Sequence, residues 1–333
     1  MCYLRRPTVS MIENSLLENC FIKRSKETIT LYRYFSTDGI ISTLKNCNLR
    51  FSSPIDFNDP YDNNYPVIKT FDQEELKKNI EKTLQRFLVS IFLTKDFEAC
   101  NVFEESIKRL IIKENIWFYK IISDFESAVE YFLKCCIDNN SFYFNPKTSI
   151  KNSDYICCFT SKYDNILMWW SHYADNHKGG VIRFDLPKDF VDGFIKVKYR
   201  DTPSNLDLNK YFFLDETEPN ELQNVVLTNL TTKYKDWSYE AEIRGVLFNS
   251  KLRNIQNYNK NVRVEGNYAY LPFDKNFVKA IYIGAKSVIQ NKKEFLEAYS
   301  SIFKNVPVYQ AEILRNSFNL KFNEIKIKGS SIN

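Results

Sequence analysis

The chain has 333 residues, 44% of them hydrophobic and 26% charged, which is typical of a folded globular protein with a full core. Its 46 basic and 41 acidic residues give a formal net charge of +5, and the basic residues are scattered along the chain. The sequence therefore does not indicate a nucleic-acid-binding face, although nucleic acid is left open as a partner. We recognise no signal peptide or membrane-spanning run, so we expect a cytoplasmic protein that makes no contact with membranes.

The first elements follow from local composition. Residues 1–27 are expected to form an extension before a single α+β domain over residues 28–333. The β-rich run Thr28–Tyr34 predicts the first strand. The Thr37-Asp38 pair supplies helix-start chemistry, and Leu49–Phe51 then predicts a short second strand.

A helical insertion is expected within this domain over residues 72–150. Apolar residues recur three or four positions apart in three successive stretches, and Asp72 is the expected cap of the first. Such stripes form a core far more often than a cofactor or partner site. Their members are Leu76, Ile80, Leu84, Phe87, Leu88 and Ile91, then Phe103, Ile107, Leu110 and Ile111, and finally Phe125, Val129, Phe132 and Leu133.

Strand character returns after the insertion. Four strands are expected at residues 155–159, 181–184, 195–199 and 278–283. A short helix carries Trp169 and Trp170 between the first two strands, and further helices are expected from Leu222 and from about Val288. The whole pattern predicts an α+β fold with a mostly antiparallel central sheet.

Cysteine and histidine spacing gives no indication of a metal site. None of the eight cysteines has C-x-x-C spacing, and two vicinal pairs, at 135–136 and 157–158, lie in apolar runs. We expect buried, reduced thiols. The two histidines, His172 and His177, are five positions apart, so on a helix they would not face the same way. We expect no metal, and a hydrogen-bonded or loop-anchoring role for these histidines.

The most informative motif is Glu240-Ala241-Glu242, which precedes an apolar, β-prone run. Alternate side chains of a strand share a face, so we expect Glu240, Glu242 and Arg244 on one face of a strand. Two neighbouring carboxylates repel each other, and one of them is expected to have a raised pKa unless a cation or ligand intervenes. The structural alternative for Glu240 is a cross-strand salt bridge.

Polar residues on two earlier strands accompany this motif. Arg33 lies in the first strand, and Thr160 and Ser161 end a middle strand. The order Arg, Ser/Thr, Glu-x-Glu strengthens the case for a site. The sequence has no P-loop, G-x-G-x-x-G or G-x-S-x-G motif, so a nucleotide would not be held in those ways.

An ordered set of motifs resembles a bacterial family catalogued as domain of unknown function 2971. The match spans roughly residues 28–290 and indicates a family but no activity. Its motifs are Leu31-Tyr32-Arg33-Tyr34, Phe51-Ser52-Ser53-Pro54, Phe57-Asn58-Asp59-Pro60, Cys158-Phe159-Thr160-Ser161, Leu167-Met168-Trp169, His172-Tyr173-Ala174, Gly179, Trp237-Ser238-Tyr239-Glu240-Ala241-Glu242-Ile243-Arg244 and Ile281-Tyr282-Ile283-Gly284.

The chain also resembles, more loosely, ADP-ribosyltransferases of the arginine–serine–glutamate type. This resemblance implies their fold and NAD as substrate. It implies that Arg33 contacts the NAD phosphates or ribose and that Thr160 and Ser161 shape the nicotinamide pocket. Tyr34 or Trp169 would stack on nicotinamide. The middle motif departs from the family pattern because it lacks the first serine.

The same resemblance implies an activity. The protein would be a bacterial effector of toxin or phage-defence biology that cleaves NAD at the nicotinamide–ribose bond. It would transfer ADP-ribose to an unknown acceptor or, as an NAD glycohydrolase, to water. Glu242 would hold the ribose hydroxyl and stabilise an oxocarbenium-like transition state, and Glu240 would orient or deprotonate the acceptor. Two alternatives remain open: a non-catalytic module that senses a nucleotide or binds a protein, and a metal-dependent nuclease-like protein that uses Asp59 with both glutamates.

Overall fold

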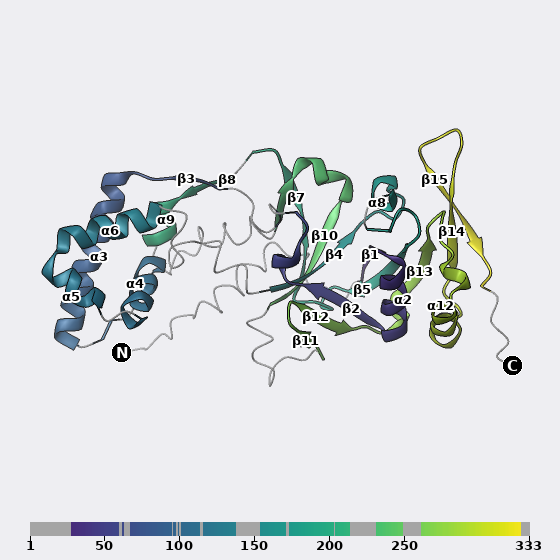
Figure 1. Cartoon of the computed structure of the whole chain (residues 1–333), viewed down its shortest axis with the longest axis horizontal. Coiled ribbons are helices and arrows are strands. Elements are labelled where there is room, and N and C mark those ends of the chain that lie inside the picture. Colours follow the sequence, from purple (N-terminus) through teal and green to yellow (C-terminus); the bar gives the residue numbers. More distant parts are fainter. Residues whose placement is uncertain are drawn as a thin grey trace. The chain divides into compact units, whose positions relative to one another are not determined.

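The chain forms two compact units (Figure 1). One contains residues 63–152 and 201–230, and the other contains residues 17–62, 153–200 and 231–333. The computed structural model describes residues 28–59, 62, 67–94, 96–97, 99, 101–113, 116–137, 154–170, 173–202, 204–213, 231–248 and 261–327. The predicted extension at residues 1–27 and the helix predicted from Leu222 lie outside the described residues.

The second unit is built on a mixed but mostly antiparallel sheet. Its described part has eleven strands in the order β11-β12-β2-β4-β1-β5-β13-β14-β15, with β10 on β4 and β6 on β10 (Figure 1). Only β13 and β14 run parallel among these pairs. The strands are β1 Thr28–Phe35, β2 Asn48–Ser52, β4 Asp154–Thr160, β5 Gly180–Pro187, β6 Gly193–Lys196, β10 Glu242–Phe248, β11 Arg263–Glu265, β12 Tyr268–Pro272, β13 Val278–Ile283, β14 Val308–Ile313 and β15 Leu320–Ile325.

Short helices complete this unit. They are α2 Thr37–Asn46, η1 Pro54–Asp56, α8 Ile166–Trp170, η2 Lys235–Glu240, η4 Lys275–Phe277, η5 Ile289–Asn291, α12 Lys293–Ala298 and η6 Tyr299–Phe303. A separate parallel pair joins β7 Lys198–Arg200 to β9 Thr232–Tyr234. Helix α2 begins at residue 37 because the Ser36 hydroxyl caps it by accepting a hydrogen bond from Gly39 N at 3.2 Å.

Alternate residues of the central strands supply two separate hydrophobic clusters. Leu31 on β1 and Phe184 on β5 belong to the larger cluster, against which Ile40 of α2 and Phe295 of α12 are fully buried. The intervening positions, such as Tyr34 and Tyr282, belong to an aromatic-rich cluster. The period of two places these clusters on opposite faces of the sheet.

The first unit is helical. It contains α3 Gln73–Thr94, α4 Val102–Lys113, α5 Ile116–Ser123, α6 Phe125–Ile137 and α9 Leu208–Phe213, with a parallel pair of β3 Val67–Thr70 and β8 Ser204–Asp207. Asp72 caps α3, as predicted, by accepting a hydrogen bond from Glu75 N at 2.9 Å. The core includes fully buried Phe103, Phe132 and Phe212. The three predicted apolar stripes correspond to α3, α4 and α6, whereas α5, α9 and the β3–β8 pair were not predicted.

The second unit also differs from the sequence predictions in places. The strand expected at residues 195–199 is divided at Val197 into β6 and β7, which pair with different partners. Strands β11, β12, β14 and β15 were not predicted. In the described part of the chain, no helix has the length and apolar character needed to cross a membrane.

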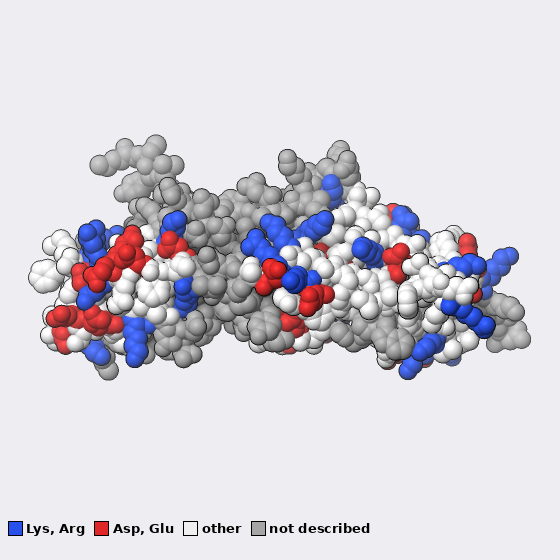
Figure 2. Space-filling model, turned by 90° about the horizontal axis from the view of Figure 1, so that it is seen from above, with Lys and Arg blue, Asp and Glu red and all other residues white. Residues whose placement is uncertain are grey.

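Charges of both signs are mixed on the face shown in Figure 2. Lys and Arg side chains alternate there with Asp and Glu in each unit. Opposite charges also pair within the helical unit, where Lys77 forms a salt bridge with Glu130 at 2.6 Å. No large area of described residues on this face carries a single sign of charge.

Candidate functional site

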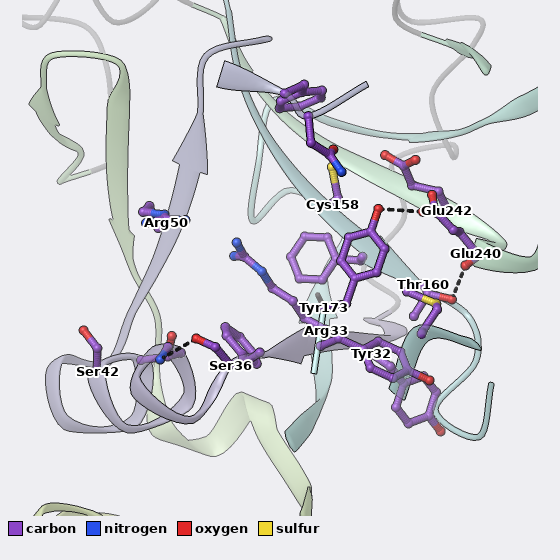
Figure 3. A pocket seen from close by; sticks show the side chains of 18 of the residues that line it. Tyr32, Arg33, Ser36, Ser42, Arg50, Cys158, Thr160, Tyr173, Glu240 and Glu242 are labelled. Atoms are coloured by element: carbon purple, nitrogen blue, oxygen red, sulfur yellow. Dashed lines mark hydrogen bonds between the residues drawn. The ribbon is translucent and has the colours of Figure 1, made fainter. Parts of the chain in front are cut away.

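The candidate site is a pocket at the place where strands β1 and β2 both pair with one edge of β4 and then separate. Thr160 and Ile156 each pair with β10 on one edge of β4. On the other edge, Thr160 pairs with Tyr32 of β1 and Ile156 pairs with Ser52 of β2. We call this arrangement the β1–β2 fork. It opens into a pocket of ≈770 Å³, which is within the range of small-molecule sites (Figure 3).

The structure corrects the predicted position of Glu240. This residue ends the 3₁₀ helix η2, and strand β10 begins only at Glu242. Ala241 between them has a left-handed conformation, with φ of 45°. The expectation that Glu240 shares one face of a strand with Glu242 and Arg244 is therefore wrong for Glu240. The turn nevertheless brings both carboxyl groups to the same pocket.

Buried ion pairs hold the two glutamates. Lys233 Nζ lies 2.7 Å from Glu240 Oε2, 3.3 Å from Glu242 Oε2 and 3.5 Å from Asp62 Oδ2. Arg244 Nε donates to Glu242 Oε1 at 2.8 Å, and its Nη2 donates to Asp62 Oδ1 at 2.6 Å. All five side chains are less than a tenth exposed, so three carboxylates and two cations are packed together out of water.

This environment separates the acidities of the three carboxyl groups. Burial acts to raise the pKa of Glu242, but Arg244 and Lys233 outweigh it and lower that pKa to about 2. For Glu240 and Asp62 the effect of burial prevails, and each pKa is raised despite the neighbouring cations. Glu242 is therefore ionised at neutral pH, whereas Glu240 holds a proton more readily than an exposed glutamate.

Further hydrogen bonds fix the glutamate turn. The Tyr173 hydroxyl donates to Glu240 Oε1 at 2.6 Å, as Figure 3 shows. The Thr160 hydroxyl donates to the Glu240 carbonyl at 2.6 Å, and Glu242 N donates to the Tyr199 hydroxyl at 2.8 Å. The Cys158 thiol also hydrogen-bonds to the Glu242 side chain, which helps to keep the pKa of Glu242 low. The turn is thus positioned before any ligand binds.

Arginines approach the pocket from the two strands of the fork. Arg33 on β1 and Arg50 on β2 both line it, and Figure 3 shows their side chains beside the pocket. Arg33 Nη1 donates to Cys157 Sγ at 2.7 Å, and its guanidinium lies over the Phe35 ring. Arg50 lies over the Tyr268 ring at 5.0 Å.

The pocket brings together most of the predicted site residues. Arg33, Tyr34, Thr160, Glu240 and Glu242 all line it. Two predicted residues are not among its lining residues, namely Ser161, which is exposed, and Trp169.

Trp169 is fully buried and is not available to stack on a ligand in this structure. Its Nε1 donates to the Tyr163 carbonyl at 2.7 Å, and one face of its ring stacks on His177 at 6.1 Å. His177 itself is buried, and its backbone N donates to the Trp169 carbonyl, which agrees with a loop-anchoring role. His172 lies outside the described residues.

Several site residues were not predicted. Asp62, Lys233 and Arg50 lie outside the quoted motifs, and Tyr173 lies within the family motif His172-Tyr173-Ala174 but was given no role. For Lys233 the one signal was its place between Thr232 and Tyr234 in a short β-prone run, because a lysine that is buried in a strand requires carboxylate partners. Arg244 was expected on the face of Glu242, and the two side chains do pair.

The described residues contain no group of three or more His, Cys, Asp or Glu side chains with metal-binding geometry. Asp62 lies beside the glutamates, and protein cations occupy the space between their carboxylates, whereas Asp59 is not among the described residues that line the pocket. The five described cysteines, Cys47, Cys135, Cys136, Cys157 and Cys158, are free thiols.

Comparison with known proteins gives one match. Residues 169–245 match the model of a family described as "Protein of unknown function (DUF2971)". Nothing among curated proteins or solved structures matches the chain. The matched stretch contains Tyr173, Lys233 and the glutamate turn, and it supports the predicted relationship to this family of unknown function.

Proposed function

We propose that the protein binds NAD in the pocket at the β1–β2 fork, cleaves its nicotinamide–ribose bond and transfers ADP-ribose to an acceptor. One observation carries this proposal. Arg33, Thr160, Glu240 and Glu242, which are far apart in the sequence, line a single pocket. They are the arginine, hydroxyl and glutamate residues that the resemblance to ADP-ribosyltransferases requires.

Glu242 suits the role of an electrostatic stabiliser. Its low pKa keeps it ionised at neutral pH, and it lines the pocket from a rigid position. When the C–N bond breaks, nicotinamide leaves as a neutral molecule with the bonding electron pair, and positive charge develops on the ribose. A fixed carboxylate in a site shielded from water stabilises that charge strongly.

Glu240 suits the role of the base. The acceptor nucleophile supplies an electron pair to the ribose carbon and must lose a proton, which Glu240 would take. Its raised pKa makes it a better proton acceptor than an ordinary glutamate, and Tyr173 and Lys233 orient its two oxygens. Arg33 would pair with the phosphates of NAD.

The test is the release of nicotinamide from NAD by the purified protein, with and without cell lysate. We expect release by the wild type and a loss of 100-fold or more in Glu242→Gln, on the order of the effect of one stabilising group. Stimulation by lysate would indicate a macromolecular acceptor. Absence of release in every condition would contradict the proposal.

A matched variant separates chemistry from structure. Asp62→Asn removes a carboxylate from the same ion-paired cluster but leaves both glutamates in place. We expect it to retain much more activity than Glu242→Gln at equal folded fraction, measured by circular dichroism. Equal losses in both variants would assign Glu242 a structural role.

A second candidate is a non-catalytic module that senses a nucleotide. It is favoured by the observation that protein groups already engage both side-chain oxygens of Glu240 and of Glu242. Such a module would bind NAD without consuming it. Isothermal titration combined with chromatography of the recovered NAD would distinguish the two candidates.

A further inference from the structure

Two arginines of the pocket have no carboxylate partner among the described residues. Among those residues, the Arg33 side chain makes one hydrogen bond, to the sulfur of a thiol, and the Arg50 side chain makes none. The other charged groups along the same part of the pocket are paired, since Arg263 forms a salt bridge with Glu265, and Asp38 lies 3.8 Å from Lys292. Arg33 and Arg50 therefore leave positive charge uncompensated at the β1–β2 fork.

Both guanidinium groups belong to arginines that line the pocket at the fork, and Arg33 donates directly to the buried Cys157 thiol there. Cys157 lies on β4 between the pairing positions of β1 and β2, and both arginines act on it electrostatically. Burial raises the pKa of this thiol to about 11, and Arg33 and then Arg50 oppose that rise. Two like charges that line one pocket repel each other, and an anion bound between them would relieve the repulsion.

Their contacts fix the arginines while leaving donors free. Arg33 lies over the Phe35 ring and Arg50 over the Tyr268 ring, at 5.2 and 5.0 Å. Ring stacking holds the plane of a guanidinium but leaves the N–H groups at its edge available. A guanidinium has five such donors in a fork that matches phosphate oxygens.

We propose that Arg50 and Arg33 together form a subsite for the diphosphate group of a nucleotide, with one arginine supplied by each strand of the β1–β2 fork. The inference rests on the proposed function for its substrate class, and it adds Arg50 as a binding residue. The glutamate turn, which lines the same pocket and pairs with β4 at Thr160, would then face the ribose to be cleaved.

The test measures binding and does not require turnover. The probes are ADP and adenosine, titrated separately into the full-length protein by calorimetry at low ionic strength. We expect the wild type to bind ADP more tightly than adenosine. Arg50→Gln should weaken ADP binding about 10- to 100-fold, the effect of losing a charge-assisted contact, and should leave adenosine binding unchanged.

Two further variants make the result specific. Arg50→Lys keeps the charge but loses the paired donors, so we expect an intermediate loss. Arg315→Gln removes the same charge from an exposed position that does not line the pocket, and we expect less than a threefold change in ADP binding. Arg50 is itself exposed, so its variants are expected to fold.

Either of two binding results would overturn the subsite: no difference between ADP and adenosine in the wild type, or ADP binding unchanged in Arg50→Gln. Failure of the proposed function looks different, because ADP would still bind through Arg50 while NAD is not consumed. Nicotinamide release that is insensitive to Arg50→Gln at limiting NAD would retain the reaction and reject the subsite.

Discussion

Glu242 keeps its charge in a buried position because Arg244 and Lys233 lie against it. Its pKa falls from an ordinary 4.5 to about 2, so its ionisation stabilises the folded state fully above pH 4.5. That contribution, about 3 kcal/mol, is lost as the pH falls from 4.5 towards 2. Glu242→Gln should therefore lower the free energy of unfolding at pH 7, and the deficit should shrink below pH 4.5.

The measurement is urea denaturation of both proteins from pH 7 down to the lowest pH at which they fold. Asp62 and Glu240 have raised pKa values, which favour the folded state at acid pH and act in the opposite direction. Comparing wild type with variant cancels much of their effect. Glu294→Gln, on an exposed part of α12, should change stability by less than about 0.5 kcal/mol at every pH. A deficit in Glu242→Gln that is constant with pH would contradict the assignment.

The loop between α8 and β5 depends on close approach of backbone to backbone. Gly284, at the end of β13, donates its N–H to the Gly179 carbonyl at 2.9 Å, and Lys286 N donates to the His177 carbonyl at 3.0 Å. A Cβ on Gly284 would lie 2.1 Å from the His177 carbonyl oxygen. Because the obstacle is backbone, Gly284→Ala should lower the free energy of unfolding by about 2–3 kcal/mol.

Gly266 offers a matched comparison for that prediction. It has φ of 56°, but a Cβ there would meet nothing within 4 Å. Gly266→Ala should therefore cost only the left-handed conformation, about 1–2 kcal/mol. Both variants are measured by chemical denaturation. A smaller loss in Gly284→Ala than in Gly266→Ala would show that the loop shifts to accommodate the methyl group.

A helix or strand was predicted well where its own sequence carries a clear pattern of apolar residues. Strands β1, β4, β5 and β13 carry continuous apolar or alternating runs, and α3, α4 and α6 carry apolar stripes, so their positions followed from the sequence. Edge strand β15 reads Leu-Lys-Phe-Asn-Glu-Ile, and its apolar–polar alternation breaks at Glu324, which weakens the period-two signal. The same holds for β11, in which all three residues are exposed.

The site shows the same division between local and non-local information. Glu242 and Arg244 are two apart on β10, so their shared face was predictable. The left-handed conformation of Ala241 was not, because alanine does not favour it. Asp62 and Lys233 reach the glutamates from distant segments, and only the folded sheet brings them together. Arg50 reaches the pocket for the same reason, since β2 joins β4 across the fork.

At the scale of the whole chain, the two units have separate cores. The hydrophobic cluster of the helical unit, which contains Phe103 and Phe132, shares no residue with the two clusters of the sheet unit, one on each face of the sheet. All described residues that line the pocket belong to the sheet unit. A cavity that a truncating substitution opens in the helical core is therefore expected to destabilise the helical unit first.

Phe132→Ala tests this independence. Phe132 is fully buried, with its ring 5.8 Å from that of Phe103, so truncation should cost about 3–5 kcal/mol. Hydrogen exchange followed by mass spectrometry should show lost protection in α3, α4, α6 and α9, with protection retained in β1, β5 and β13. The matched change Phe184→Ala, in the sheet core, should show the reverse pattern. Loss of protection in both units of either variant would mean that the chain unfolds as one cooperative structure.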